Sequence, residues 1–90
     1  MKNKKLVLSR PFEKAFVKLP KKIRETTYQK LELLLTNPAH PSLQVKKMKG
    51  TQTIWEMRLS LSHRVTFEIG EESILLRKIG TEGGRSQQIN

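Results

Sequence analysis

Two arginines, Arg58 and Arg64, have the type and spacing that best suit chemistry on a phosphate group. Each lies in a stretch where apolar and polar residues alternate, which is the pattern of a strand with one buried face. If residues 54–60 and 64–69 pair as a hairpin, both guanidinium groups stand on the open face of the sheet. The planar guanidinium matches the geometry of a phosphate. The pair therefore predicts a site for a polyanion backbone.

The same face also carries carboxylates, and these allow a second interpretation. Glu56 lies in the first of the two stretches and Glu68 in the second. Cross-strand salt bridges, Arg58 with Glu68 and Arg64 with Glu56, would neutralise both arginines and leave a purely structural face. The sequence leaves these two interpretations open.

A basic segment precedes the two strands. Residues 37–50 contain two prolines and end at Gly50, with Lys46, Lys47 and Lys49 close together. A loop of this length in a small domain commonly carries function. We expect its lysines to join the arginines in one basic platform.

The two histidines are the side chains that titrate nearest to neutral pH. His63 precedes Arg64 directly and is a candidate proton donor, while His40 lies in the basic loop. An ordinary solvated histidine is the alternative for both. The sequence has no Cys and no Asp, and its histidines lack metal-ligand spacing with a carboxylate, so we expect neither a metal nor a cofactor.

The net charge of +10 on 90 residues predicts a polyanionic partner. The whole excess lies in residues 1–50, whereas residues 51–90 are balanced. No apolar run approaches the ~18 residues of a membrane span, and the start of the chain lacks the pattern of a secretory signal. We therefore expect a cytoplasmic protein with no membrane contact.

The periodicity predicts a single α+β domain over residues 1–90. A short strand at 5–8 leads to Ser9, a predicted helix cap, and to a helix whose apolar face includes Phe12 and Phe16. A second helix over 21–35 is expected to pack antiparallel on the first, as a helical hairpin. A small antiparallel sheet of three or four strands follows, at 54–60, 64–69 and 74–79. Residues 81–90 have no periodicity and form a possible flexible tail.

This order of elements, together with particular residues, resembles the RelE/ParE superfamily, the toxins of type II toxin–antitoxin systems. The resemblance covers nearly the whole chain and rests on six segments in order, at residues 12–21, 35–38, 46–50, 54–59, 63–69 and 74–80. It implies a RelE-like fold, in which an N-terminal strand and a helical hairpin pack on a small antiparallel sheet.

The resemblance also implies an activity and two partners. In the RelE-like branch, the toxin enters the ribosomal A site and cleaves mRNA by attack of a ribose 2′-OH on the adjacent phosphate, without metal. The implied partners are a cognate antitoxin that neutralises the toxin, and mRNA on the ribosome with contacts to rRNA. The alternatives are a ParE-type toxin that inhibits DNA gyrase, a catalytically weakened RelE-like homologue, and a basic nucleic-acid-binding module.

Residue roles follow from the same resemblance. Arg64 matches the arginine that contacts the scissile phosphate, and Arg58 matches a basic residue on the preceding strand. Glu82 stands where many relatives have His or Arg, and Glu56 stands at a basic position. We consider either glutamate a candidate base and His63 a candidate acid. The expected RNA contacts are Lys46, Lys47, Lys49, His40 and Arg85.

Overall fold

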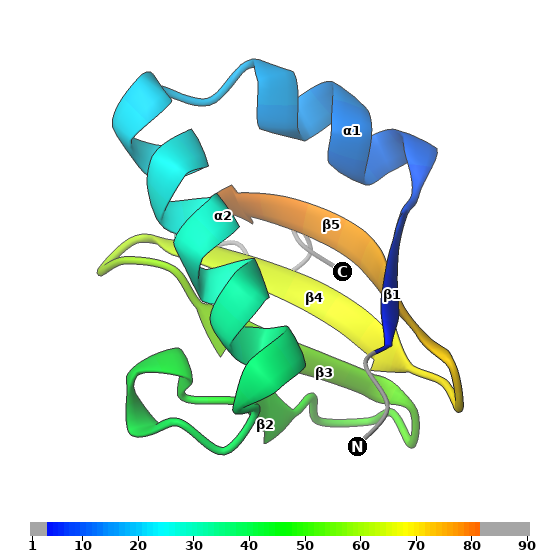
Figure 1. Cartoon of the computed structure of the whole chain (residues 1–90). Helices are drawn as coiled ribbons and strands as arrows, with labels where there is room; N and C mark the ends of the chain where they lie inside the picture. The colour runs from blue at the N-terminus through cyan, green and yellow to red at the C-terminus, as the bar shows by residue number, and fades with distance from the viewer. Residues whose placement is uncertain (1–3, 82–90) are drawn as a thin grey trace.

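The computed structural model describes residues 4–81, which form two α-helices and five β-strands. Figure 1 shows both helices on one face of the sheet, so the expected single α+β domain consists of two layers. In chain order the elements are β1 (Lys5–Leu8), α1 (Arg10–Val17), α2 (Lys21–Thr36), a 3-10 turn η1 (Pro41–Leu43), β2 (Lys46–Lys47), β3 (Ile54–Arg58), β4 (His63–Ile69) and β5 (Ser73–Thr81).

The sheet is larger than the three or four antiparallel strands that we expected. Its order is β1-β5-β4-β3-β2, and β1 runs parallel to β5 while the other pairs are antiparallel. The second strand was missed because β2 is only two residues long, which is too short to show a period. The direction of β1 was missed because alternation within a strand does not specify the direction of its neighbour.

The hydroxyl of Ser9 fixes the corner between β1 and α1. Its Oγ accepts a hydrogen bond from the backbone N–H of Phe12 at 3.2 Å, which makes it the predicted N-cap. The same hydroxyl donates to the backbone carbonyl of Arg77 at 2.7 Å. One side chain therefore both begins α1 and ties that helix to β5.

The sequence predicts that the two helices pack antiparallel along their length, but in the structure they do not. They spread apart from the corner at Pro20 (Figure 1), and α1 packs chiefly on β5. The rings of Phe16 on α1 and Tyr28 on α2 meet edge to face with their centroids 5.4 Å apart. Because α1 has only eight residues and directs its buried Phe12 at the sheet, little of its surface remains for α2.

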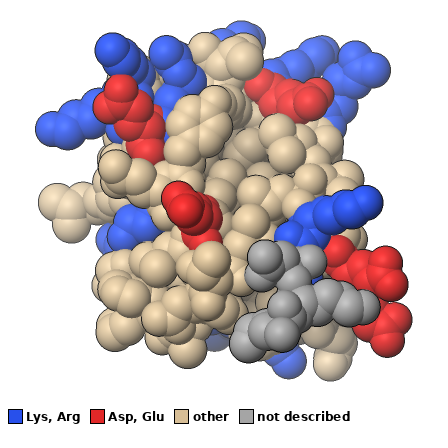
Figure 2. All heavy atoms as spheres, viewed as in Figure 1, with Lys and Arg blue, Asp and Glu red and all other residues tan. Residues whose placement is uncertain are grey.

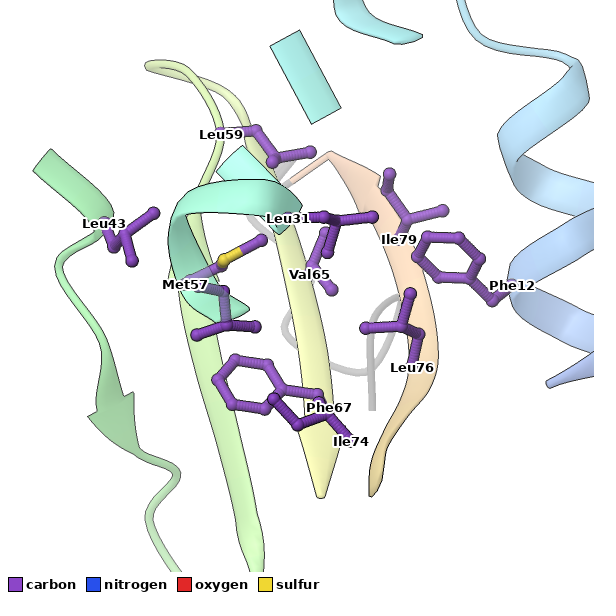
Figure 3. Close-up of a cluster of buried hydrophobic side chains, with 11 residues drawn as sticks. Phe12, Leu31, Leu43, Met57, Leu59, Val65, Phe67, Ile74, Leu76 and Ile79 are labelled. Atoms are coloured by element: carbon purple, nitrogen blue, oxygen red, sulfur yellow. The ribbon is translucent and has the colours of Figure 1, made fainter. Parts of the chain in front are cut away.

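The core lies between the helices and the sheet (Figure 3), and its largest side chains are fully buried. Met57, Val65 and Phe67 face the helices as the alternation predicts. Ile69 is an exception, with 45% of its surface exposed, because it ends β4 next to the turn at Gly70. In residues 4–81, no helix has the length and apolarity that a membrane crossing requires.

Candidate functional site

Arg58 and Arg64 are direct partners across the β3–β4 ladder. Their sequence neighbours Met57 and Val65 point into the core, so alternation places both arginines on the face away from the helices. The hairpin and the shared face are therefore as predicted.

The carboxylate of Glu56 lies at the centre of this face, between two cations. Its Oε2 is 2.6 Å from Nη1 of Arg64 and 3.4 Å from Nζ of Lys46. Lys46 faces Glu56 directly in the β2–β3 register, and Glu56 is only 7% exposed. One of the two cross-strand ion pairs that the sequence left open is therefore present.

The other expected pair, Arg58 with Glu68, does not form. Glu68 lies opposite Ile54, four residues further along β4 than Arg64, which is roughly 13 Å at about 3.3 Å per residue. Its carboxylate instead lies 3.4 Å from Nε of Arg77 on β5. Alternation specifies the face on which a side chain lies but not how far along the strand its partner is. The prediction therefore paired Arg58 with a glutamate that lies too far away.

Neutral acceptors hold Arg58 at the rim of the face. Its Nε donates to Oε1 of Gln44 at 3.2 Å, and its Nη1 donates to the carbonyl of Leu61 at 3.4 Å. Among the ion pairs formed within residues 4–81, none includes Arg58. This guanidinium therefore keeps its full charge available to an incoming anion.

Gln44 was not predicted as a site residue from the sequence. Its backbone is left-handed in the structure, with φ 48°. The positive φ turns the chain directly after η1 and before β2. The amide of Gln44 thereby reaches Arg58, which lies 14 residues away in sequence.

The three lysines of the basic segment do not form one platform. Lys46 shares the face of Arg64, whereas Lys47 faces Trp55 in the register and places its ammonium 5.4 Å from the centroid of that ring. Lys49 lies beyond β2, exposed, next to Gly50. The lysines are separated because the segment expected to be a loop contains a strand, in which consecutive side chains point to opposite faces.

Both histidines take part in turns. Nδ1 of His63 lies 3.3 Å from Oγ of Ser60 and 3.2 Å from Oγ of Ser62. Alternation along β4 places the His63 side chain on the helix-covered side with Val65, opposite to Arg64. The imidazole of His63 and the guanidinium of Arg64 therefore lie on opposite faces of the sheet.

His40 caps η1, where its Nδ1 accepts from the backbone N–H of Ser42 at 3.1 Å. Glu82 and Arg85 lie outside the described residues. Within residues 4–81, no three side chains of the metal-ligating types gather in one place.

The helix-covered side has a different character. In Figure 2 the lysines and arginines of this side lie mainly at the rim, with acidic side chains among them, and the middle is mostly uncharged apart from an acidic side chain. An apolar groove of about 300 Å³ runs between β1 and the two helices, with Leu8, Phe16, Tyr28 and Leu35 among its lining residues. The molecule therefore has a cationic region on its sheet face and, on the other side, an apolar groove that Glu32 also lines.

The part of the sheet face around Arg64 gathers three cations, Lys46, Arg58 and Arg64, and one carboxylate, Glu56, so the formal charge of this part is positive. Arg58 and Arg64 stand side by side on paired strands, and Lys46 adds an ammonium from the next strand. Such a group can bind the oxygens of a phosphate and stabilise added negative charge during its reaction.

No family model and no curated protein matches the sequence. Solved structures do match, with superpositions that cover most of both chains. The archaeal RelE–RelB complex from Pyrococcus horikoshii matches at a TM-score of 0.75 and 20% identity, over 92% of this chain and 99% of that one.

Two further structures agree with this match. A double mutant of the E. coli toxin RelE in the free state matches at a TM-score of 0.74 and 18% identity, over 93% of this chain and 88% of that one. The E. coli DinJ–YafQ toxin–antitoxin complex matches at 0.73 and 14% identity, over 91% and 96%. At these identities the likeness establishes the fold, and the predicted RelE-like fold is confirmed.

Proposed function

We propose that this chain, which has the RelE-like fold, is the toxin of a type II toxin–antitoxin system and an endoribonuclease that cleaves mRNA on the ribosome. The observation that carries the proposal is the pairing of Arg58 with Arg64 on a rigid sheet, with Lys46 beside them. The fold is shared with RelE and YafQ toxins, and the activity is the one that the sequence resemblance implies.

The proposed reaction uses side chains alone. A ribose 2′-OH attacks the adjacent phosphorus, the bond from the 2′-oxygen to phosphorus forms, and the bond to the 5′-oxygen breaks. The products are a 2′,3′-cyclic phosphate and a free 5′-hydroxyl. Negative charge grows on the non-bridging oxygens, where Arg58 and Arg64 would stabilise it by charge-assisted hydrogen bonds.

The proton of the 2′-OH needs a base, and the leaving 5′-oxygen needs a proton. Glu56 is the carboxylate that contacts Arg64 on this face, and it is our candidate base there. Glu82 is the other candidate from the sequence. We leave His63 out of the proposed mechanism because strand alternation directs it to the opposite side of the sheet from Arg64.

The proposal is tested with purified protein and translating ribosomes, by following mRNA cleavage. Arg58→Ala is the preferred variant, because Arg64 also holds the buried Glu56 and its loss would affect folding. Removing one donor to the developing charge typically lowers the rate about 100-fold. Lys22→Ala removes the same charge from the exposed side of α2 and serves as the control. An Arg58→Ala rate equal to that of wild type would contradict the proposal.

A catalytically weakened homologue is the second candidate function. It is favoured by the ion pair between Glu56 and Arg64, which compensates one of the two arginines. Such a chain would bind RNA and leave it uncut in the ribosome assay. The three solved structures described above are RelE and YafQ proteins and give no support to the gyrase-inhibiting alternative.

The proposed partner is an antitoxin. The P. horikoshii and DinJ–YafQ structures are toxin–antitoxin complexes, and the net charge of +10 favours an acidic partner for this chain. An amphipathic segment fits the apolar groove at Phe16 and Tyr28, and its acidic side chains can pair with lysines and arginines at the rim of this side. The proposed target, mRNA on the ribosome, implies a cytoplasmic location.

A further inference from the structure

Glu56 is a carboxylate that lies among the cations of the sheet face. It is buried, and it forms ion pairs with two cations that we assign to RNA binding, Arg64 and Lys46. Three neighbouring strands hold the three groups, Lys46 on β2, Glu56 on β3 and Arg64 on β4. The carboxylate is thus fixed by the sheet in the middle of the proposed phosphate site.

We propose that Glu56 is an internal competitor for RNA, and that its carboxylate occupies the position on Arg64 and Lys46 that a backbone phosphate oxygen must take. The identity of the ligand, RNA, rests on the proposed function. The competition itself rests on the geometry, because carboxylate and phosphate oxygens bind a guanidinium through the same hydrogen-bonding edge.

Charge and access support this exchange. Glu56 reduces the formal charge of the Arg64–Lys46 pair from +2 to +1. The Lys46 side chain is 65% exposed whereas that of Arg64 is 12% exposed, so a phosphate would approach from the Lys46 side. Because the strand holds the carboxylate in place, each phosphate must displace it before it reaches Arg64.

The consequence is a raised threshold for RNA binding. A single phosphate forms an ion pair with Arg64 only when the ion pair between Arg64 and Glu56 breaks. The net free energy of binding that this phosphate contributes is therefore small. Arg58, which forms no ion pair within residues 4–81, can then add affinity without such an exchange. The exchange would also free Glu56 from its cations beside the bound backbone, where the proposed mechanism requires a base.

The test is the affinity of Glu56→Gln for a short single-stranded RNA whose 2′-hydroxyls are methylated, so that it cannot be cleaved. We expect binding about tenfold tighter than wild type at low salt, the size of one charge-assisted contact. The slope of log affinity against log salt should become steeper by about 0.7, because the Glu56 carboxylate no longer competes with phosphate for Lys46 and Arg64.

Glu68→Gln is the matched control. It removes the same charge from the same sheet face, but its partner is Arg77 rather than Arg64. We expect its affinity to stay within about twofold of wild type, since only a screened long-range term changes. If Glu68→Gln tightens binding as much as Glu56→Gln, net charge explains the effect and the competitor role is wrong.

Glu56→Asp separates contact from charge and protects the test against misfolding. It keeps the negative charge but withdraws the carboxylate by one methylene from Arg64 and Lys46, so we expect an affinity between those of wild type and Glu56→Gln. Thermal unfolding confirms that each variant is folded. Folded Glu56 variants that bind RNA no more tightly than wild type would overturn the inference.

This outcome is independent of the outcome for the nuclease. The RNA in the binding assay cannot be cleaved and needs no ribosome. Tighter binding by Glu56→Gln without any cleavage by wild type would support the competitor and reject the nuclease. Cleavage by wild type with unchanged binding by Glu56→Gln would do the reverse.

Discussion

The ion pair between Arg64 and Glu56 should be a main stabilising contact of the sheet face as well as a functional one. Arg64→Met leaves the carboxylate of Glu56, 7% exposed, with Lys46 at 3.4 Å as its remaining cationic partner in residues 4–81. Removing one partner of a buried pair typically costs 3–5 kcal/mol. Because Lys46 remains, we expect a loss of about 2–3 kcal/mol and a melting temperature lower by roughly 10 °C or more.

The coupling is measured by a double-mutant cycle with Glu56→Gln, using urea unfolding followed by circular dichroism. In the double variant neither charge is left buried without the other. Its loss of unfolding free energy should therefore be about 2 kcal/mol smaller than the sum of the losses in the two single variants. The more exposed pair Glu68–Arg77, at 3.4 Å, should couple by about 0.5 kcal/mol in a parallel cycle. If the Arg64–Glu56 coupling is no larger than that of this control pair, the reasoning is refuted.

Three further predictions concern the elements that support the site. Ser9→Ala should destabilise the fold by about 1–2 kcal/mol in urea, because it removes the cap of α1 and the bond to the Arg77 carbonyl; an unchanged midpoint would contradict this. Gly50→Ala should cost about 1 kcal/mol in the same assay, since φ is 78° and a Cβ there meets open space, so strain is the only cost; a stabilised variant would be inconsistent with that backbone. Lys46→Ala should weaken RNA binding and flatten its salt dependence more than Lys47→Ala, because only Lys46 shares the arginine face, and equal effects would argue against that placement.

Strand alternation was sufficient to predict the central feature of the site. The period of two placed Arg58 and Arg64 on one face, and one of the two proposed glutamate pairings, Arg64 with Glu56, is present. The cap at Ser9 was equally predictable, because Ser, Pro and Glu near a helix start act through local contacts. These features depend on residues close in sequence or on a simple hairpin.

The remaining features depend on register and on distant contacts. Glu68 lies on the predicted face but too far along β4 to reach Arg58. Alternation alone does not specify the distance between two residues along neighbouring strands. The separation of Lys46 from Lys47 depends on a two-residue strand that forms only because β3 lies beside it. Gln44 contributes through a left-handed turn that no local pattern indicated.

We propose that the RNA backbone binds to the sheet face at β3 and β4 and not to the helix side. The most direct measurement is a titration of isotope-labelled protein with the methylated single-stranded RNA, followed by amide chemical shifts in NMR. We expect shifts that concentrate at Lys46, Arg58 and Arg64 and at their neighbours on the three strands. Shifts confined to α1 and α2, with these strands unperturbed, would contradict it.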